Sequence, residues 1–173
     1  MAKITIQVTL NKSELLYDIE NKAWLTGRSR EDGANASSVS KMQADDEAAD
    51  RNQMTRCMMN AVATLRNHIA EWINDLNVNE VTDVLDTGSA FTIVLKLPMN
   101  YNTSVNKTIG FAMHQYVVNT ALAEWYGMTA KDEAQNYYTL AAANLQQLKE
   151  ATFKRLRPSK PVATVGLGVM HNS

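Results

Sequence analysis

The chain has 173 residues, of which 45% are hydrophobic and 20% charged, and its formal net charge is −1. This size and composition are typical of one soluble globular domain, and the near-neutral total excludes a general attraction to nucleic acid or to an anionic membrane surface. The single cysteine, Cys57, excludes an intrachain disulfide and a metal site with several cysteine ligands, and its helical surroundings favour a small buried residue over a reactive thiol.

Residues 1–10 alternate polar and apolar side chains, which predicts a strand with one buried face. The apolar members are Ile4, Ile6, Val8 and Leu10. The same stretch has no unbroken apolar run, so we expect neither a signal peptide nor a membrane span, and a location inside the cell or in a particle assembled there. Asn11 then caps a predicted short helix, which Gly27 ends.

Residues 28–43 predict a long mobile loop. They contain Gly33, several serines and almost no large apolar side chain. A loop of this length within a compact domain is usually functional or disordered.

The longest helical pattern runs from about residue 44 to residue 76, with one continuous apolar stripe. The stripe consists of Met54, Met58, Ala61, Leu65, Ile69, Trp72 and Leu76. Asp45, Asp46 and Glu47 lie in the first turn of this predicted helix, where negative charge complements the helix dipole.

A β-hairpin is predicted after this helix. Val84 and Leu85 precede the turn residues 87–89, and a second strand follows until Pro98 stops it. The alternating apolar residues of that strand are Phe91, Ile93, Leu95 and Leu97. With the N-terminal strand, the hairpin gives a sheet of about three strands, which is stable only when it packs on a helix.

Two further long helices are predicted in the last third of the chain. The first begins near Ser104 or Asn106 and ends at Gly127, and Thr129 caps the second, which runs to about Leu156. So short a connection requires the two helices to lie antiparallel or sharply bent. We therefore predict an α+β fold, mainly helical, in which long antiparallel helices pack with a small β-hairpin or three-stranded sheet as one domain over residues 1–157.

An extended C-terminal arm is predicted over residues 158–173, which prolines and glycines punctuate. Its apolar side chains would stay in water unless the chain's own core or a neighbouring subunit covers them. We interpret them as a candidate arm for binding a neighbour: Val162, Val165, Leu167, Val169 and Met170.

A basic cluster precedes and enters this arm, with Glu150 as the one acid among its members. The cluster consists of Lys149, Lys154, Arg155, Arg157 and Lys160. Two interpretations stay open: the positive charge complements the C-terminal end of the last helix, or it contacts DNA phosphates or an acidic partner.

The sequence shows no catalytic or metal-binding motif. His68, His114 and His171 lie far apart and lack a second ligand at helical spacing, and no phosphate-binding glycine loop or nucleophile elbow is present. We therefore expect no enzyme, no cofactor and no metal.

The order of the predicted elements, with two segments of the last third, resembles a known family. The segment Ala-Glu-Trp-Tyr-Gly at 123–127 leads into Thr-Ala-Lys-Asp-Glu-Ala-Gln-Asn-Tyr-Tyr at 129–138, and the helix closes with Phe-Lys-Arg-Leu-Arg-Pro at 153–158. Over roughly residues 41–158 this is similar to head-to-tail connector proteins of tailed phages, also called adaptor, ring or head-completion proteins, including those of crAss-like and other Bacteroidales phages.

The resemblance implies a structural virion protein that forms a homo-oligomeric ring of about twelve copies below the portal, through head-to-tail contacts that close on themselves. Its implied partners are the portal protein and the next neck or tail ring, with non-specific contact to DNA in the passage and no membrane. The alternatives are a tail-completion accessory factor and a small nucleic-acid-associated factor that uses the basic cluster, whereas an enzyme is the least favoured hypothesis.

Overall fold

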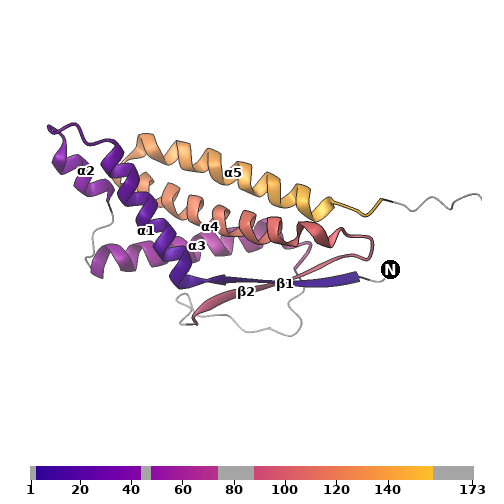
Figure 1. Cartoon of the computed structure of the whole chain (residues 1–173). Coiled ribbons are helices and arrows are strands. Elements are labelled where there is room, and N and C mark those ends of the chain that lie inside the picture. Colours follow the sequence, from indigo (N-terminus) through magenta and orange to yellow (C-terminus); the bar gives the residue numbers. More distant parts are fainter. Residues whose placement is uncertain (1–2, 44–47, 74–87, 158–173) are drawn as a thin grey trace, which may run out of the picture.

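The computed structural model describes residues 3–43, 48–73 and 88–157, and helices dominate this part of the chain. The α+β, mainly helical class predicted from the sequence is confirmed. The elements are β1 (Lys3–Asn11), α1 (Lys12–Ser29), α2 (Ala36–Met42), α3 (Ala48–His68), β2 (Ala90–Pro98), a 3-10 turn (Thr103–Val105), α4 (Asn106–Thr129) and α5 (Lys131–Phe153). Figure 1 shows α4 and α5 as an antiparallel pair, with α3 and the two strands on the other side of α4.

The two strands pair antiparallel and turn one face toward the helices. Ile4, Ile6 and Val8 of β1 stand opposite Leu97, Leu95 and Ile93 of β2, so the aliphatic residues of both strands share that face. The other edge of β2 is approached by the turn after α3, through a bridge between Ile73 and Leu95 and a 2.7 Å bond from the Lys96 amide to the Trp72 carbonyl.

The sheet therefore has two strands among the described residues, in place of the three expected. The first arm of the predicted hairpin, with Val84 and Leu85, lies outside the described part of the chain. The second arm is present as β2, which pairs with the N-terminal strand.

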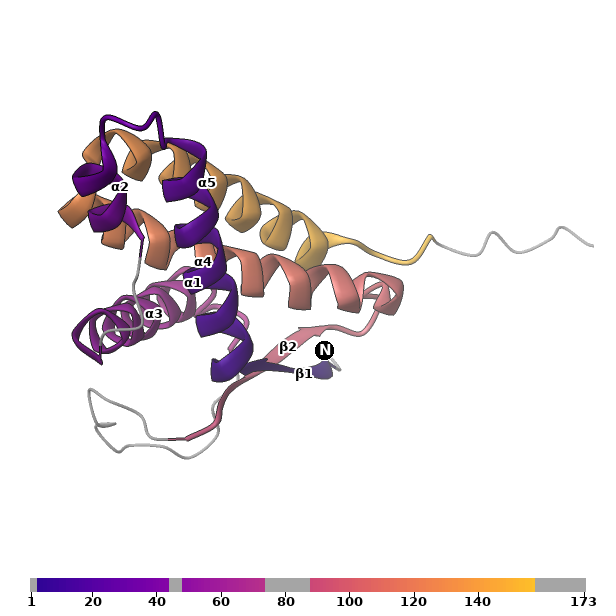
Figure 2. The same cartoon turned by 60° about the vertical axis from the view of Figure 1, so that its left-hand side comes forward.

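α4 is the central helix, and α5, α3, α1 and β1 all pack against it. Its sequence from 108 to 123 contains no Asp, Glu, Lys or Arg, and a helix that is apolar on every side is typically buried. Its buried residues are Ile109, Ala112, Met113, Tyr116, Val117, Val118, Asn119, Ala121, Leu122, Ala123, Trp125 and Tyr126. Figure 2 shows α1 crossing α4 at a steep angle, so that α1 covers one end of the α4–α5 pair.

The prediction of a long mobile loop over residues 28–43 is wrong. α1 continues through Gly27 to Ser29, and α2 forms within the predicted loop. The two large apolar residues of α2, Val39 and Met42, are buried, and the Met42 carbonyl accepts a 3.1 Å hydrogen bond from the indole N–H of Trp125. Contacts with α4 therefore order a segment whose composition alone predicts a loop.

Other helix boundaries also differ from the predicted ones. α3 ends at His68, and residues 69–72 form a turn. The carbonyl of Trp72 in this turn accepts a hydrogen bond from β2, which an α-helix continuing to residue 76 would not allow. α4 runs past Gly127 to Thr129, and Thr129 caps nothing: its hydroxyl donates to the Trp125 carbonyl one turn earlier, at 3.1 Å. α5 ends at Phe153, and the predicted arm from Pro158 onward lies outside the described residues.

Candidate functional site

A chain of polar side chains crosses the interface between α1 and the α4–α5 pair. The ammonium of Lys22 donates to Gln115 Oε1 at 2.8 Å and to Asn119 Oδ1 at 3.3 Å. Asn119, which is buried, donates through Nδ2 to Asn144 Oδ1 on α5 at 2.8 Å. Burial lowers the pKa of Lys22 from its ordinary value, and the nearby charge of Asp18 acts in the opposite direction.

One turn away on α1, Asp18 contacts His114 of α4, with 2.7 Å between Oδ2 and Nε2. His114 is therefore a partly buried helix-face residue with a carboxylate partner, at the same crossing as Lys22. The two contacts together fix the position of α1 along α4.

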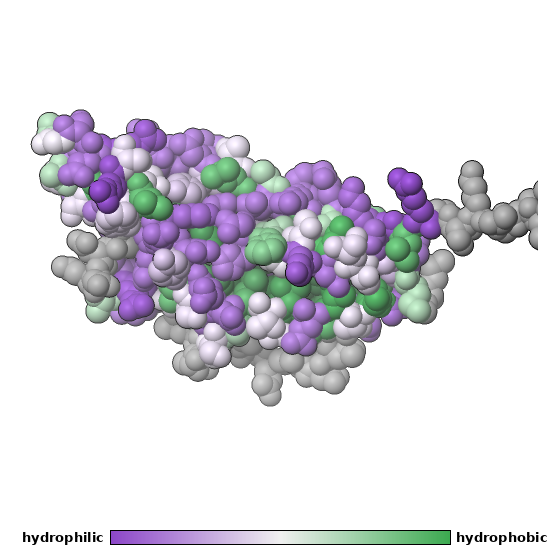
Figure 3. All heavy atoms as spheres, viewed as in Figure 1, coloured by the Kyte–Doolittle hydropathy of each residue, from purple (hydrophilic) through white to green (hydrophobic). Residues whose placement is uncertain are grey.

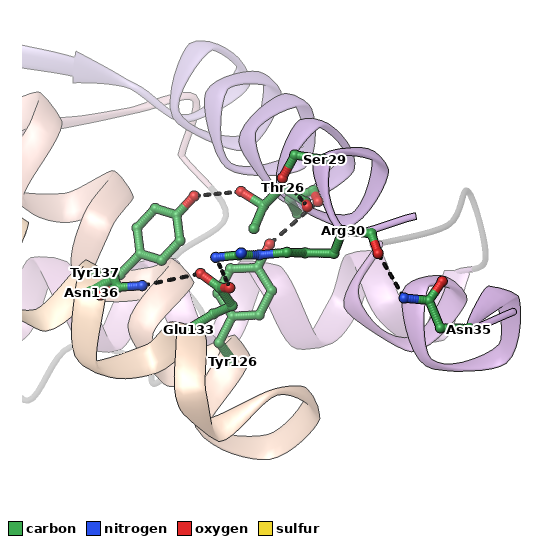
Figure 4. A network of polar contacts seen from close by, with 9 residues as sticks. Thr26, Ser29, Arg30, Asn35, Tyr126, Glu133, Asn136 and Tyr137 are labelled. Atoms are coloured by element: carbon green, nitrogen blue, oxygen red, sulfur yellow. Dashed lines mark hydrogen bonds and ion pairs between the residues drawn. The ribbon is translucent and has the colours of Figure 1, made fainter. Parts of the chain in front are cut away.

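The C-terminal end of α1 is held by a second set of polar contacts, drawn in Figure 4. The hydroxyls of Thr26 and Tyr137 lie 2.7 Å apart, and Tyr126 donates to the Ala23 carbonyl at 3.3 Å. Arg30 pairs with Glu133 in the first turn of α5. The rings of Tyr126 and Tyr137 stack with centroids 5.3 Å apart. These side chains satisfy one another, so they serve the packing of α1 on the helical pair.

Groups with chemical reactivity are either buried or dispersed in the described part of the chain. Cys57 is fully buried on α3, and burial, with Glu124 nearby, raises the pKa of its thiol to about 11. The ring of His68 meets the edge of Tyr116 at 6.1 Å. Within residues 3–43, 48–73 and 88–157, no three His, Cys, Asp or Glu side chains converge as metal ligands would. His171 lies outside these ranges.

The outer face of α5 is exposed and carries no charge along much of its length. Residues 134–148 contain no Asp, Glu, Lys or Arg. Ala141 faces α4 and is buried, whereas Ala142 and Ala143 are exposed, and Tyr138 and Leu140 remain 52% and 50% exposed. An exposed helix normally carries charges on its solvent side, and their absence, with aromatic and small residues present, is typical of a protein–protein interface.

The C-terminal end of α5 forms a basic and apolar tip. Lys154 and Arg157 are exposed, and Phe153 and Leu156 beside them are 59% and 56% exposed. A shallow open hollow at the tip is lined by Gln146, Lys149, Glu150, Phe153 and Lys154.

The predicted basic cluster is brought together only in part. Arg155 donates to the Thr152 carbonyl at 2.7 Å, so its guanidinium serves the end of the helix, as the first interpretation of the cluster required. Lys149, Lys154 and Arg157 remain on the surface of the tip, whereas Lys160 and the five apolar residues of the predicted arm lie outside the described residues.

Sequence reasoning missed the polar crossing of α1 and α4. Lys22 and Gln115 are 93 positions apart, and no local pattern links them. The uncharged stretch of α5 was visible in the sequence, but its exposure follows only from the packing of the helices.

None of the described helices combines the length and the apolar composition that crossing a bilayer requires. Comparison with protein-family models, with curated proteins and with solved structures finds no match to this chain.

Proposed function

We propose that this chain is a structural subunit of the head-to-tail connector of a tailed phage. In this proposal it forms a homo-oligomeric ring below the portal, contacts the portal and the next neck or tail ring, and lines the DNA passage of the virion. The observation that carries the proposal is the uncharged, exposed face of α5, which ends in a basic tip.

The uncharged face suits a contact between subunits. Ala142 and Ala143 allow the backbone of a neighbouring helix to approach closely, and Tyr138 and Leu140 on the flanks of the face supply apolar area. A face without charge also brings no like-charge repulsion when identical subunits meet in a ring.

The basic tip suits contact with DNA without sequence preference. Lys149, Lys154 and Arg157 offer positive charge to phosphates, which position a protein on DNA without carrying sequence information. The resemblance in element order, and in the residues at the α4–α5 connection and at the end of α5, supports the connector in particular.

The direct test is quantitative peptide mass spectrometry of purified particles from the source, with portal peptides as the internal standard. The proposal expects about one copy per portal subunit, as stacked rings of equal symmetry require. Absence of the chain from particles would overturn it. Cross-linking to the portal distinguishes the connector from a tail-completion position, which is the alternative within the same class.

A matched pair of variants tests the α5 face in the same assay. Ala142→Glu places a charge in the middle of the face and is expected to abolish incorporation into particles. Ala36→Glu makes the same change at an exposed alanine of α2 and is expected to leave incorporation unchanged. Equal incorporation of both variants would remove the α5 face from the proposal.

The alternative function is a small nucleic-acid-associated factor, and the positive charge of the tip, where Lys154 and Arg157 are exposed and Lys149 is half-buried, favours it. It predicts that the isolated protein binds duplex DNA with an affinity that falls steeply with salt, and that the triple change K149Q/K154Q/R157Q lowers the salt slope. Negligible binding at low salt would eliminate this alternative.

A further inference from the structure

Strand β1 leaves one of its two edges without a partner strand in the described part of the chain. It pairs with β2 on one side, and within residues 3–43, 48–73 and 88–157 no strand or bridge pairs with its other side. β1 is nine residues long and unbulged, contains neither glycine nor proline, and has Lys3 as its single charged residue. Natural edge strands are usually protected by short length, proline, bulges or charges. Residues 4–11 carry none of these protections, so this edge is suited to pairing with another strand.

The hydrogen bonds around the sheet show which backbone groups of β1 face this edge. The Lys12 amide donates to the Ser89 carbonyl at 3.0 Å, whereas the Lys96 amide, opposite Thr5, donates away from β1 to the Trp72 carbonyl. In an antiparallel pair, successive residues alternate between bonding to the partner strand and facing away from it. The even-numbered residues of β1 therefore bond to β2. The backbone groups that face the open edge belong to Lys3, Thr5, Gln7 and Thr9.

The sequence of β1 has nearly the same pattern in both directions from Gln7. Residues 4–10 are Ile-Thr-Ile-Gln-Val-Thr-Leu. If two copies of β1 pair antiparallel about this residue, Gln7 lies opposite Gln7 of the second copy, and Thr5 lies opposite Thr9. These are the residues whose backbone groups face the edge, so the two copies meet with the hydrogen-bonding geometry of an antiparallel ladder. Thr–Thr pairs are also among the favourable cross-strand pairs.

The aliphatic residues of the two copies match on the helix-facing side of the sheet. Ile4 would stand opposite Leu10 of the second copy, and Ile6 opposite Val8. In the single chain Leu10, next to the start of α1, is buried, whereas the other three are only half-buried. Figure 3 shows hydrophobic surface gathered along the line where β1 runs beside α4. The two-fold arrangement would bring the start of α1 of the second copy to the half-buried end of this row.

We propose that two copies of this chain pair through the open edges of β1, antiparallel and centred on Gln7, to form one continuous sheet. All nine residues of β1 then find a partner, because Lys3 lies opposite Asn11 and Gln7 is the midpoint. The contact is isologous and closes after two copies, so it differs from the head-to-tail contacts of the proposed ring. The inference therefore does not rest on the proposed function.

The competing occupant of this edge is the C-terminal segment of the same molecule. Residues 154–156 bond to residues 100–102, just after β2, so the end of α5 lies beside the start of β1. Residues 158–173, however, contain two prolines and two glycines, which weaken a strand, whereas β1 matches a second β1 at every position. The match in register favours the second copy, and the experiments below separate the two occupants.

Two measurements on the purified full-length protein test this inference: its mass over a concentration series, and hydrogen exchange of the individual β1 amides by NMR. We expect a monomer–dimer equilibrium in which the amides of Thr5, Gln7 and Thr9 become protected as the dimer forms. The amides of the even-numbered residues bond to β2 in monomer and dimer alike, so their protection is the internal control.

Spin labels on single cysteines, introduced with Cys57→Ala, test the register. Labels on Gln7→Cys face each other across the two-fold axis, where opposite Cα atoms lie about 5.5 Å apart. Labels on Lys3→Cys are displaced by eight residues along the strands, which is about 27 Å at 3.4 Å per residue. We therefore expect strong dipolar broadening for the first variant and a long distance for the second.

Charge substitutions at Gln7 test the two-fold contact itself. Gln7→Lys places two lysines opposite each other, so it is expected to weaken association several-fold, and Gln7→Glu is expected to do the same. An equal mixture of these two variants is expected to restore association as a heterodimer. Thr9→Lys adds the same charge opposite a threonine and is the matched control, with association close to that of the native protein.

Three outcomes would overturn the inference. Protection of the edge amides in a monomer at every concentration would assign the edge to a segment of the same molecule. Free exchange of these amides at every concentration would show that no second copy binds there. A dimer that Gln7→Lys leaves unchanged, or whose labels at position 7 are no closer than those at position 3, would place the contact on another surface. Self-association is measured without particles, so its failure is distinguishable from failure of the connector proposal.

Discussion

The ammonium of Lys22 on α1 lies 2.8 Å from the side-chain oxygen of Gln115 on α4, and Asn119 carries the same chain of hydrogen bonds on to Asn144 of α5. Three helices are therefore joined by one polar network across an otherwise apolar interface. Apolar contacts fix no single register, whereas buried hydrogen bonds are lost when the helices slide. The network thus specifies where α1 sits on the helical pair.

Replacing Asn119 with alanine is expected to lower the free energy of unfolding by about 1–3 kcal/mol, because Asn144 Oδ1 loses its donor and the partly buried Lys22 ammonium loses one of its two acceptors. Urea unfolding measures the change. Gln147→Ala, at an exposed position of α5, is the control and is expected to change stability by less than about 0.5 kcal/mol. Equal effects of the two substitutions would show that the network does not contribute.

The buried position of Lys22 predicts a specific dependence of stability on pH. Burial lowers its pKa in the folded state, so the unfolded chain binds the proton more tightly. Stability must then rise with pH between the lowered pKa and the ordinary value of 10.5, and the penalty for the buried charge is present in full below that window.

The comparison of the native protein with Lys22→Met isolates this effect, since the other titrating groups are common to both. We expect the native protein to gain stability relative to the variant as pH rises toward 10.5, measured by urea unfolding at several pH values. Parallel pH profiles would contradict a lowered pKa.

The sequence predicted the elements whose hydrophobic pattern shows directly which of their faces are buried. The alternation in β1 and β2 and the apolar α4 each follow from one face, or all faces, being covered. The sequence did not predict helix α2, because its order depends on two buried residues, Val39 and Met42, that contact helices distant in the sequence.

Glycine was misread as a helix stop at Gly27 and Gly127 for a related physical reason. A glycine costs a helix about 1 kcal/mol, which is less than the packing of the helix around it contributes. Neither residue has the positive φ that a glycine stop requires, whereas Gly33 does, at 81°. The polar network of Lys22 could not be predicted from the sequence either, because its members lie on three separate helices.

The two helical glycines differ in their surroundings, and this predicts opposite responses to alanine. A Cβ on Gly127 would meet nothing within 4 Å, so Gly127→Ala is expected to stabilise the protein by up to about 1 kcal/mol. A Cβ on Gly27 would lie 2.5 Å from Gln43 Cγ, so the steric conflict is expected to cancel or exceed the gain there.

The double change G27A/Q43A removes that obstacle and is expected to recover the gain relative to Q43A alone. Thermal or urea unfolding of the four proteins in this cycle measures the coupling between the two positions. Additive effects of the two substitutions would show that the Gln43 side chain moves aside without cost. The close approach of α1 to the end of α2 would then not restrict the residue at position 27.

The thiol of Cys57 predicts how the core of the protein opens. It is fully buried, and its pKa of about 11 in the folded state, against 9.0 ordinarily, lowers the thiolate fraction at pH 8 by about 100-fold. Iodoacetamide is therefore expected to label Cys57 only through opening of the structure, at a rate that rises with urea.

The double variant R56C/C57A, with its thiol at the exposed neighbouring position, is expected to react rapidly without urea. Labelling of Cys57 at the rate of that control would mean that α3 separates readily from α4, and the packing around the central helix would then be weaker than its burial indicates.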